Sequence, residues 1–258
     1  MRSVAGRSII ITGAASGLGE ATAKFLAARG ARVTLLDLDE AKGAKAVDTI
    51  GANVAQFVKT DVTNEDSVKA AIAAAVGKFG PLNAAVSCAG IAPPAKILGK
   101  KGVHDLALFQ KVVTVNLIGT FNILRLAAAE MAKNDPALTF GERGVIINTA
   151  SIAAYDGQIG QCAYASSKAG VVGLTLPAAR ELAASFIRVN TIAPGIMGTP
   201  MLMGLPQAAQ DSLNKSVPFP ARMGMPEEYA GLVEHILNNG YMNGETIRLD
   251  GALRMGPT

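Results

Sequence analysis

Three side chains in the second half of the chain have the types and spacing of an acid–base site. Tyr164 and Lys168 are four residues apart in a segment of helical composition, so both are expected on one helix face. A free tyrosine has a pKa of about 10, and a nearby ammonium group favours its phenolate form. Ser151 follows an apolar run and could hydrogen-bond a carbonyl or an alcohol. Together the three predict proton transfer at a substrate oxygen.

The alternative for such a pair is an ordinary helix surface, because Tyr-x-x-x-Lys is common there. Tyr155 is a useful comparison, since the residue four positions on is Ile159 and supplies no cation. Asn116 is a further polar candidate, because it stands in an apolar helical stretch where a buried amide must find hydrogen-bond partners.

A glycine-rich turn near the N-terminus predicts a dinucleotide site. Residues 12–19 read TGAASGLG between an apolar run and a helical segment. Glycines there allow a tight turn, and backbone N–H groups at the helix start can approach a pyrophosphate. Asp37 ends the next apolar run, where its carboxylate could accept hydrogen bonds from a ribose and would repel a 2′-phosphate. The pattern therefore favours NAD over NADP.

The elements that must position these residues follow from the alternation along the chain. Short β-branched runs predict seven strands at 9–12, 32–37, 54–59, 83–88, 145–149, 188–192 and 246–249. Alanine-rich segments predict helices at 19–29, 67–79, 104–131 and 162–184. Such alternation is typical of an α/β fold, a single doubly wound Rossmann domain spanning 1–258 with a seven-stranded parallel sheet and helices on both faces.

Composition excludes several other classes of protein. Half of the residues are apolar and 17% are charged, which is enough to build a core. Two cysteines and two histidines give no disulfide framework and no metal cluster. The net charge of +4 comes from scattered lysines and arginines, so we expect no nucleic-acid surface. We expect no apolar stretch to reach the roughly 18 residues needed to span a bilayer, and hence no membrane-spanning segment. We also expect no signal peptide.

The spacing T-G-x-x-x-G-x-G, followed by Ser151, Tyr164 and Lys168, resembles the short-chain dehydrogenase/reductase family, and the resemblance covers almost the whole chain. Asp61-Val62 matches the pair that flanks the adenine, and Pro194 to Thr199 matches the segment that receives the nicotinamide carboxamide. Cys88 departs from the family, which usually has Asn-Asn-Ala-Gly where this chain has Ser-Cys-Ala-Gly. The resulting candidate cofactor residues are Gly13, Ser16, Gly17, Leu18, Gly19, Asp37, Asp61, Val62, Cys88, Ala89, Gly90, Tyr164, Lys168, Pro194, Ile196, Met197 and Thr199.

The resemblance also implies an activity. Segments 145–151, 217–220 and 249–252 look like those of family members that oxidise 3-hydroxyacyl-CoA esters with NAD. It implies a catalytic tetrad of Asn116, Ser151, Tyr164 and Lys168, with Asn116 holding a water that passes protons to Lys168. The substrate would contact Ser151, Gln158 and Tyr164, under a loop at about 91–110 and a lid at about 197–222. Lys96, Lys100 and Lys101 in that loop could meet the phosphates of CoA or be merely solvated.

Three alternatives remain open at this point: a hydroxysteroid dehydrogenase, a 3-oxoacyl carrier-protein reductase, and a non-enzymatic NAD-binding partner. The reductase generally uses NADPH, and Asp37 and Ser16 argue against that cofactor. The intact tetrad argues against a non-enzymatic role. The resemblance further implies a homotetramer. We expect a cytoplasmic protein, with the mitochondrial matrix as the alternative.

Overall fold

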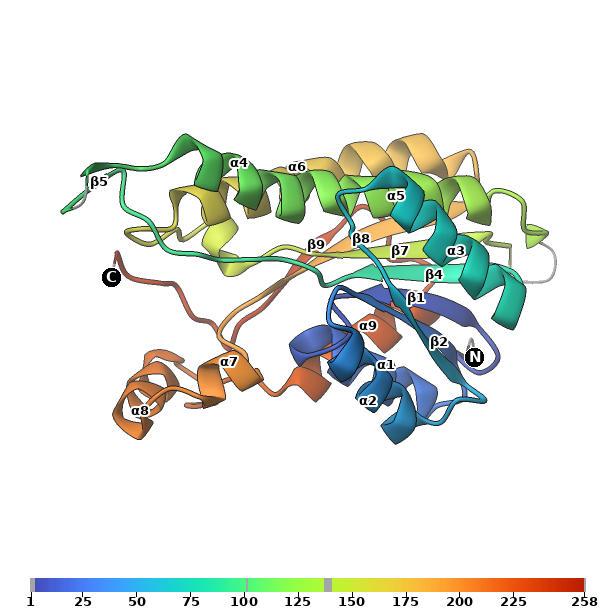
Figure 1. Ribbon diagram of the computed structural model, residues 1–258, viewed down its shortest axis with the longest axis horizontal. Coiled ribbons are helices and arrows are strands. Elements are labelled where there is room, and N and C mark those ends of the chain that lie inside the picture. Colours follow the sequence, from blue (N-terminus) through green and yellow to red (C-terminus); the bar gives the residue numbers. More distant parts are fainter. Residues whose placement is uncertain (1–2, 101, 137–140, 258) are drawn as a thin grey trace.

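The computed structural model describes residues 3–100, 102–136 and 141–257 (Figure 1). Its centre is a seven-stranded sheet whose neighbouring strands are all parallel, in the order β3-β2-β1-β4-β7-β8-β9. The strands are β1 (Ser8–Thr12), β2 (Arg32–Asp37), β3 (Ala55–Lys59), β4 (Leu82–Ser87), β7 (Gly144–Thr149), β8 (Ile187–Pro194) and β9 (Thr246–Leu249). The predicted α/β fold and the seven parallel strands are confirmed.

Helices cover both faces of the sheet, as the sequence predicts (Figure 1). One face packs against α1 (Gly17–Ala27), α2 (Glu40–Ile50) and α9 (Pro226–Asn238). The other packs against α3 (Glu65–Phe79), α5 (Gly119–Met131) and α6 (Cys162–Ala183). The apolar strands explain this layering, because every residue of β1 and of β7 is buried. Helices α2 and α9 lie outside the four helical segments that the sequence analysis names.

The predicted single helix at 104–131 is a composite of three elements. It consists of α4 (Leu106–Val113), a π-helical turn η1 (Thr114–Ile118) and α5. By length and composition this run could cross a membrane, so the expectation that no stretch is long enough is wrong. Half of its most apolar window is buried inside the protein. A buried core helix passes the same length and composition test.

The candidate substrate loop and lid lie at the edge where the strands end, together with the C-terminal residues (Figure 1). The loop contains a short hairpin of β5 (Leu98–Gly99) and β6 (Gly102–Val103), which the sequence analysis does not predict. Lys96 and Lys100 are exposed there, whereas Lys101 lies outside the described residues. The candidate lid contains α7 (Pro200–Met203) and α8 (Gln207–Ser216).

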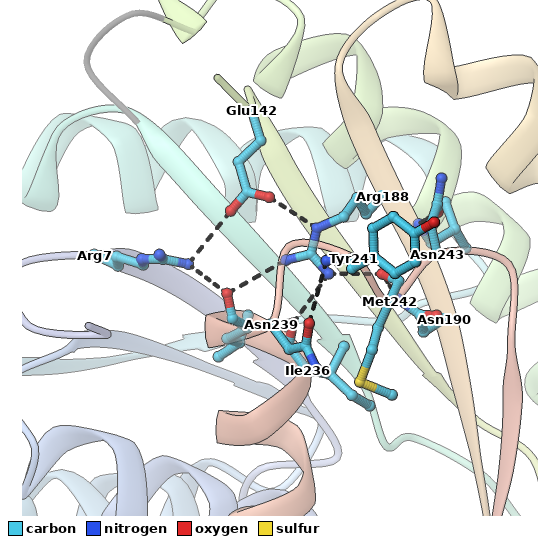
Figure 2. Close-up of polar contacts among 11 residues, drawn as sticks. Arg7, Glu142, Arg188, Asn190, Ile236, Asn239, Tyr241, Met242 and Asn243 are labelled. Atoms are coloured by element: carbon cyan, nitrogen blue, oxygen red, sulfur yellow. Dashed lines mark hydrogen bonds and ion pairs between the residues drawn. The ribbon is translucent and has the colours of Figure 1, made fainter. Parts of the chain in front are cut away.

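A buried charged cluster joins the opposite end of the sheet to α9 (Figure 2). The Arg188 Nε donates to Glu142 at 2.8 Å, and both side chains are less than a tenth exposed. Arg7 lies on the other side of Glu142, at 3.7 Å. Arg188 also donates to the carbonyl oxygens of Ile236 and Leu237, which lie in the last turn of α9. A cation there satisfies helix-terminal carbonyls and is favoured by the helix dipole.

Candidate active site

The glycine-rich turn and the turn after β4 meet at the point where the strand order reverses. The Thr12 Oγ1 accepts hydrogen bonds from the backbone N–H groups of Cys88 and Ala89, both at 3.1 Å. Gly13 has a φ of +63°, and a Cβ there would lie 2.8 Å from the Ala89 nitrogen. In open α/β sheets, ligands bind beyond the strand ends at such a reversal. Cys88 is therefore a close neighbour of the predicted cofactor turn.

The geometry of the turn requires the glycines of the motif. Gly17 begins α1 with a φ of +58°, and a Cβ on Gly19 would collide with the Gly13 carbonyl oxygen. Ser16 is the exposed N-cap of α1, and its side chain makes no capping hydrogen bond. Leu18 is partly buried against the core. The start of α1 thus presents its N–H groups in a turn that side chains do not fill, which fits a pyrophosphate.

Asp37 joins the end of β2 to this turn. Its carboxylate accepts hydrogen bonds from Ala15 N at 3.0 Å, Leu38 N at 2.7 Å and Asp39 N at 3.2 Å. The side chain is half-buried, so a negative charge is fixed beside the glycine-rich turn. The contact to a ribose stays a prediction.

Asp61 and Val62 follow β3, and both form hydrogen bonds that stabilise the local chain conformation. The Asp61 carboxylate accepts from the N–H and hydroxyl groups of Thr63. Val62 is buried, and its carbonyl oxygen accepts from the Asn122 amide at 2.9 Å. Gly119 leaves room for Val62, since a Cβ on the glycine would lie 2.6 Å from Cγ2 of the valine.

Ser151, which is buried after β7, and Tyr164, which is half-buried on α6, form a polar pair. Ser151 is 8% exposed, and its Oγ accepts from Ala153 N at 3.1 Å. Burial raises the pKa of Tyr164, and a hydrogen bond with Ser151 lowers it in part. A hydroxyl pair of this kind could hold one substrate oxygen from two sides.

Lys168 lies one helical turn after Tyr164, as predicted, but its ammonium group does not bond the phenol. The Lys168 Nζ donates to the Thr149 carbonyl oxygen at 2.8 Å and lies 5.9 Å from the Tyr164 ring centre. Burial lowers the pKa of Lys168 to about 8. The expectation that Lys168 lowers the pKa of Tyr164 is therefore not met, because burial is the largest effect on both groups.

Asn116 occupies the π-helical turn and is fully buried. Its side-chain amide exchanges hydrogen bonds with the backbone of Ile91, at 2.8 and 2.9 Å, and donates to the Ser167 hydroxyl at 3.0 Å. Gly90 leaves room beside it, since a Cβ there would lie 3.1 Å from Asn116 Oδ1 and 3.5 Å from Lys168 Nζ. Asn116, Gly90 and Lys168 are thus brought together, as the predicted tetrad requires.

The segment after β8 reaches back to the glycine-rich turn. Pro194 ends the strand, Ile196 is partly buried and Met197 is buried. A Cβ on Gly17 would lie 3.6 Å from Cγ2 of Thr199, so this threonine faces the turn. The placement agrees with a cofactor that passes between the two segments.

Gln158 is placed less favourably for the predicted substrate contact. Its amide nitrogen donates to the Gly256 carbonyl oxygen at 3.3 Å, and its amide oxygen accepts from Gln161 at 3.3 Å. Both polar ends are therefore engaged within the protein. Tyr155 is about half exposed and lies under Arg248, 5.1 Å from the guanidinium carbon to the ring centre.

Sequence reasoning missed two residues that contact this site. Thr149 supplies the acceptor of Lys168, and its hydroxyl lies 2.7 Å from that of Tyr229 on α9. The position of Thr149 two residues before Ser151 was a usable signal, whereas nothing in the local sequence marks Tyr229. In residues 3–100, 102–136 and 141–257, no group of three or more His, Cys, Asp or Glu residues is arranged to hold a metal ion.

Comparison with known proteins agrees with this arrangement. Residues 7–210 match the short chain dehydrogenase family, so the chain belongs to that family of oxidoreductases, which use nicotinamide cofactors. The chain is 54% identical to the 3-hydroxyacyl-CoA dehydrogenase type-2 of Bos taurus, covering 99% of this chain and 98% of the relative. The Homo sapiens protein of the same name has the same identity and coverage. The crystal structure of 3-hydroxyacyl-CoA dehydrogenase type-2 from Mycobacterium avium superposes with a TM-score of 0.92, at 47% identity and 98% coverage of both chains.

Proposed function

We propose that this protein is an NAD-dependent dehydrogenase that interconverts 3-hydroxyacyl-CoA and 3-oxoacyl-CoA esters. The observation that carries the proposal is the convergence of Ser151, Tyr164 and Lys168 beyond the strand ends, beside a glycine-rich turn. The acyl-CoA substrate is supported by relatives whose names specify it, at 54% identity over nearly the whole chain.

Each catalytic side chain has one task in this proposal. Tyr164 takes the proton of the substrate hydroxyl during oxidation and returns it during reduction. Ser151 holds the reacting oxygen. Lys168, whose ammonium group is held by the Thr149 carbonyl oxygen, would hold the nicotinamide ribose, and Asn116 fixes the π-helical turn beside it. The bound nicotinamide supplies the chemistry of accepting or giving hydride.

The preference for NAD rests on charge. Asp37 holds a carboxylate beside the glycine-rich turn, where it would accept hydrogen bonds from ribose hydroxyls and repel a 2′-phosphate. Ser16 stands at the start of α1 without a positive charge. These two residues favour NAD and disfavour the proposal of an NADPH-linked carrier-protein reductase.

The test is a screen for NAD reduction by purified protein. We expect turnover with 3-hydroxyacyl-CoA esters of several chain lengths and much less turnover with NADP. Hydroxysteroids and simple secondary alcohols form the comparison arms. Greater kcat/KM for a hydroxysteroid than for every acyl-CoA would replace the proposed substrate class. No turnover in any arm would refute the proposed function.

A further inference from the structure

Tyr229 is a large polar side chain buried on the side of the sheet opposite the catalytic helix. It lies on α9, whereas Lys168 lies on α6 across the sheet (Figure 1). The Tyr229 side chain is fully buried, and its hydroxyl lies 2.7 Å from Thr149 Oγ1 and 3.5 Å from Cys88 Sγ. A buried hydroxyl must be hydrogen-bonded, so these contacts determine where the tyrosine can sit.

Thr149 connects this hydroxyl to the catalytic lysine. It is the last residue of β7, and its carbonyl oxygen accepts the hydrogen bond from Lys168 Nζ at 2.8 Å. Its side chain points to the opposite face and meets Tyr229. The side-chain hydroxyl of Thr149 therefore contacts α9 and its carbonyl oxygen contacts α6, at the point where the chain leaves β7 toward Ser151.

We infer that Tyr229 is a positioning residue, whose hydroxyl fixes Thr149 and thereby the carbonyl oxygen that holds Lys168. This inference rests on the proposed dehydrogenase function. The Tyr229 hydroxyl contacts Thr149 and Cys88, and it acts on Lys168 through Thr149, so it takes no part in proton or hydride transfer.

The charges around Lys168 make the position of this carbonyl oxygen important. The titratable groups that face the lysine are Tyr164 on its own helix and Cys88 after β4, with Tyr229 behind Cys88. Burial raises the pKa of Cys88 and of Tyr229, so both remain protonated near neutral pH. A displaced carbonyl oxygen would stabilise the ammonium form less. The pKa of Lys168, already lowered to about 8, would then fall further.

The experiment compares four variants with the wild-type enzyme over a range of pH. Tyr229→Phe removes only the hydroxyl, and Thr149→Val removes its partner while keeping the backbone carbonyl. Thr149→Ser keeps the hydroxyl and serves as the rescue variant. Tyr241→Phe is the matched control, because the Tyr241 side chain is fully exposed.

We expect kcat to fall about three- to tenfold in Tyr229→Phe and Thr149→Val, with KM for the acyl-CoA within about twofold. The basic limb of the kcat profile should move to lower pH by about half a unit in both variants. Thr149→Ser and Tyr241→Phe should retain the wild-type profile. The double variant Tyr229→Phe/Thr149→Val should show little loss beyond either single variant, because both remove one interaction.

An unchanged basic limb in Tyr229→Phe would overturn the inference, even if thermal stability falls. A Thr149→Ser profile that resembles Thr149→Val would also overturn it. If Tyr229→Phe does not fold, the contrast between Thr149→Val and Thr149→Ser decides the question alone. Absence of turnover in the wild-type enzyme would instead refute the proposed function, so the two failures are distinguishable.

Discussion

Burial acts in opposite directions on the two titratable groups of the candidate active site. It raises the pKa of Tyr164 and lowers that of Lys168 to about 8, so each shift favours the neutral form. The phenol is therefore a proton donor at rest, as reduction of a ketone requires. In the direction of oxidation it must first lose this proton, and the Ser151 hydroxyl is the neighbour that favours such a loss.

Removing the phenol hydroxyl tests this assignment directly. Tyr164→Phe should lower turnover by about 10²-fold or more, the usual scale for losing a general acid–base group. NAD binding, measured by calorimetry, should change little because the ring remains. Tyr155→Phe is the matched control, since Tyr155 lies on the neighbouring segment without a lysine one turn away. Near-normal turnover in Tyr164→Phe would show that another group transfers the proton.

Two variants of Asp37 separate the contribution of its charge to cofactor preference from that of its hydrogen bonds. Asp37→Ala should weaken NAD binding about ten- to a hundredfold, the equivalent of one charge-assisted hydrogen bond, and should relax discrimination against NADP. Asp37→Asn keeps an acceptor oxygen but removes the charge, so it should relax discrimination with a smaller loss of NAD affinity. Both affinities can be measured by competition binding. Equal use of both cofactors by the wild-type enzyme would contradict the argument.

Spacing along the chain is the signal for part of the candidate site. The glycines of residues 13–19 and the pair Tyr164 and Lys168 follow from local geometry, and the structure brings them to one edge. The contact between Thr149 and Tyr229 joins residues from opposite faces of the sheet. Only the packing of α9 against the sheet creates that contact, so no local pattern could predict it.

At the scale of elements, the composite helix also shows that local sequence patterns do not predict contacts between distant segments. Its apolar composition predicts one continuous helix at 104–131, but a π-helical turn interrupts it at Asn116. The Asn116 amide pairs with the Ile91 backbone beside Gly90, in a loop that follows β4. Such turns occur often at functional sites, and their position depends on tertiary contacts that composition does not encode.

The charged cluster at the other end of the sheet should contribute strongly to stability. Glu142→Ala would leave the buried Arg188 guanidinium without its carboxylate, and the free energy of unfolding should fall by about 3–5 kcal/mol. The control is Glu130→Ala, since Glu130 pairs with the largely exposed Lys133 and should contribute about 0–1 kcal/mol. Urea unfolding at one protein concentration measures both. Equal losses of unfolding free energy in Glu142→Ala and Glu130→Ala would contradict the larger contribution assigned to the buried ion pair.

The β5–β6 hairpin gives the acyl-CoA proposal a test of its own. Lys100→Glu, alone or with Lys96→Glu, should raise KM for a 3-hydroxyacyl-CoA about two- to fivefold per lysine at low salt, because both lysines are exposed near the strand ends. Salt should reduce the effect, since the Debye length is about 10 Å at 0.1 M. An uncharged alcohol substrate should be unaffected. Lys45→Glu on α2 is the control, and an equal effect there would assign the hairpin lysines to ordinary solvated surface.

At the scale of the whole molecule, the composite helix leaves apolar side chains on the surface. Leu106, Ile118 and Phe121 are each 46–67% exposed. Large exposed apolar groups gathered along one helical run are typical of protein interfaces. They support the proposal that the protein is a homotetramer, in which a second copy would cover this surface.

Light scattering should therefore give a mass of about four 26.4 kDa chains. Phe121→Glu places a charge in the proposed interface and should produce smaller species without loss of secondary structure. Tyr241→Glu is the control, because its side chain is fully exposed and lies beside the Arg188 cluster rather than on the composite helix (Figure 2). A wild-type monomer would contradict the proposal.

The parallel sheet also determines the order in which the molecule can fold. Every neighbouring pair in the seven-stranded sheet is parallel, so each pairing closes a loop that contains at least one helix or a longer connection. The pairing of β1 with β4 joins Ser8 to Leu82, across a connection that contains β2, β3 and the helices α1, α2 and α3. Because closing a loop of that length is slow, we expect the pairing of β1 with β4 to form late in folding. The glycine-rich turn and the turn of Cys88 and Ala89 lie on its two sides. The cofactor site is therefore expected to form only when the two halves of the sheet dock, and a refolding chain should gain nicotinamide binding after most of its helical structure.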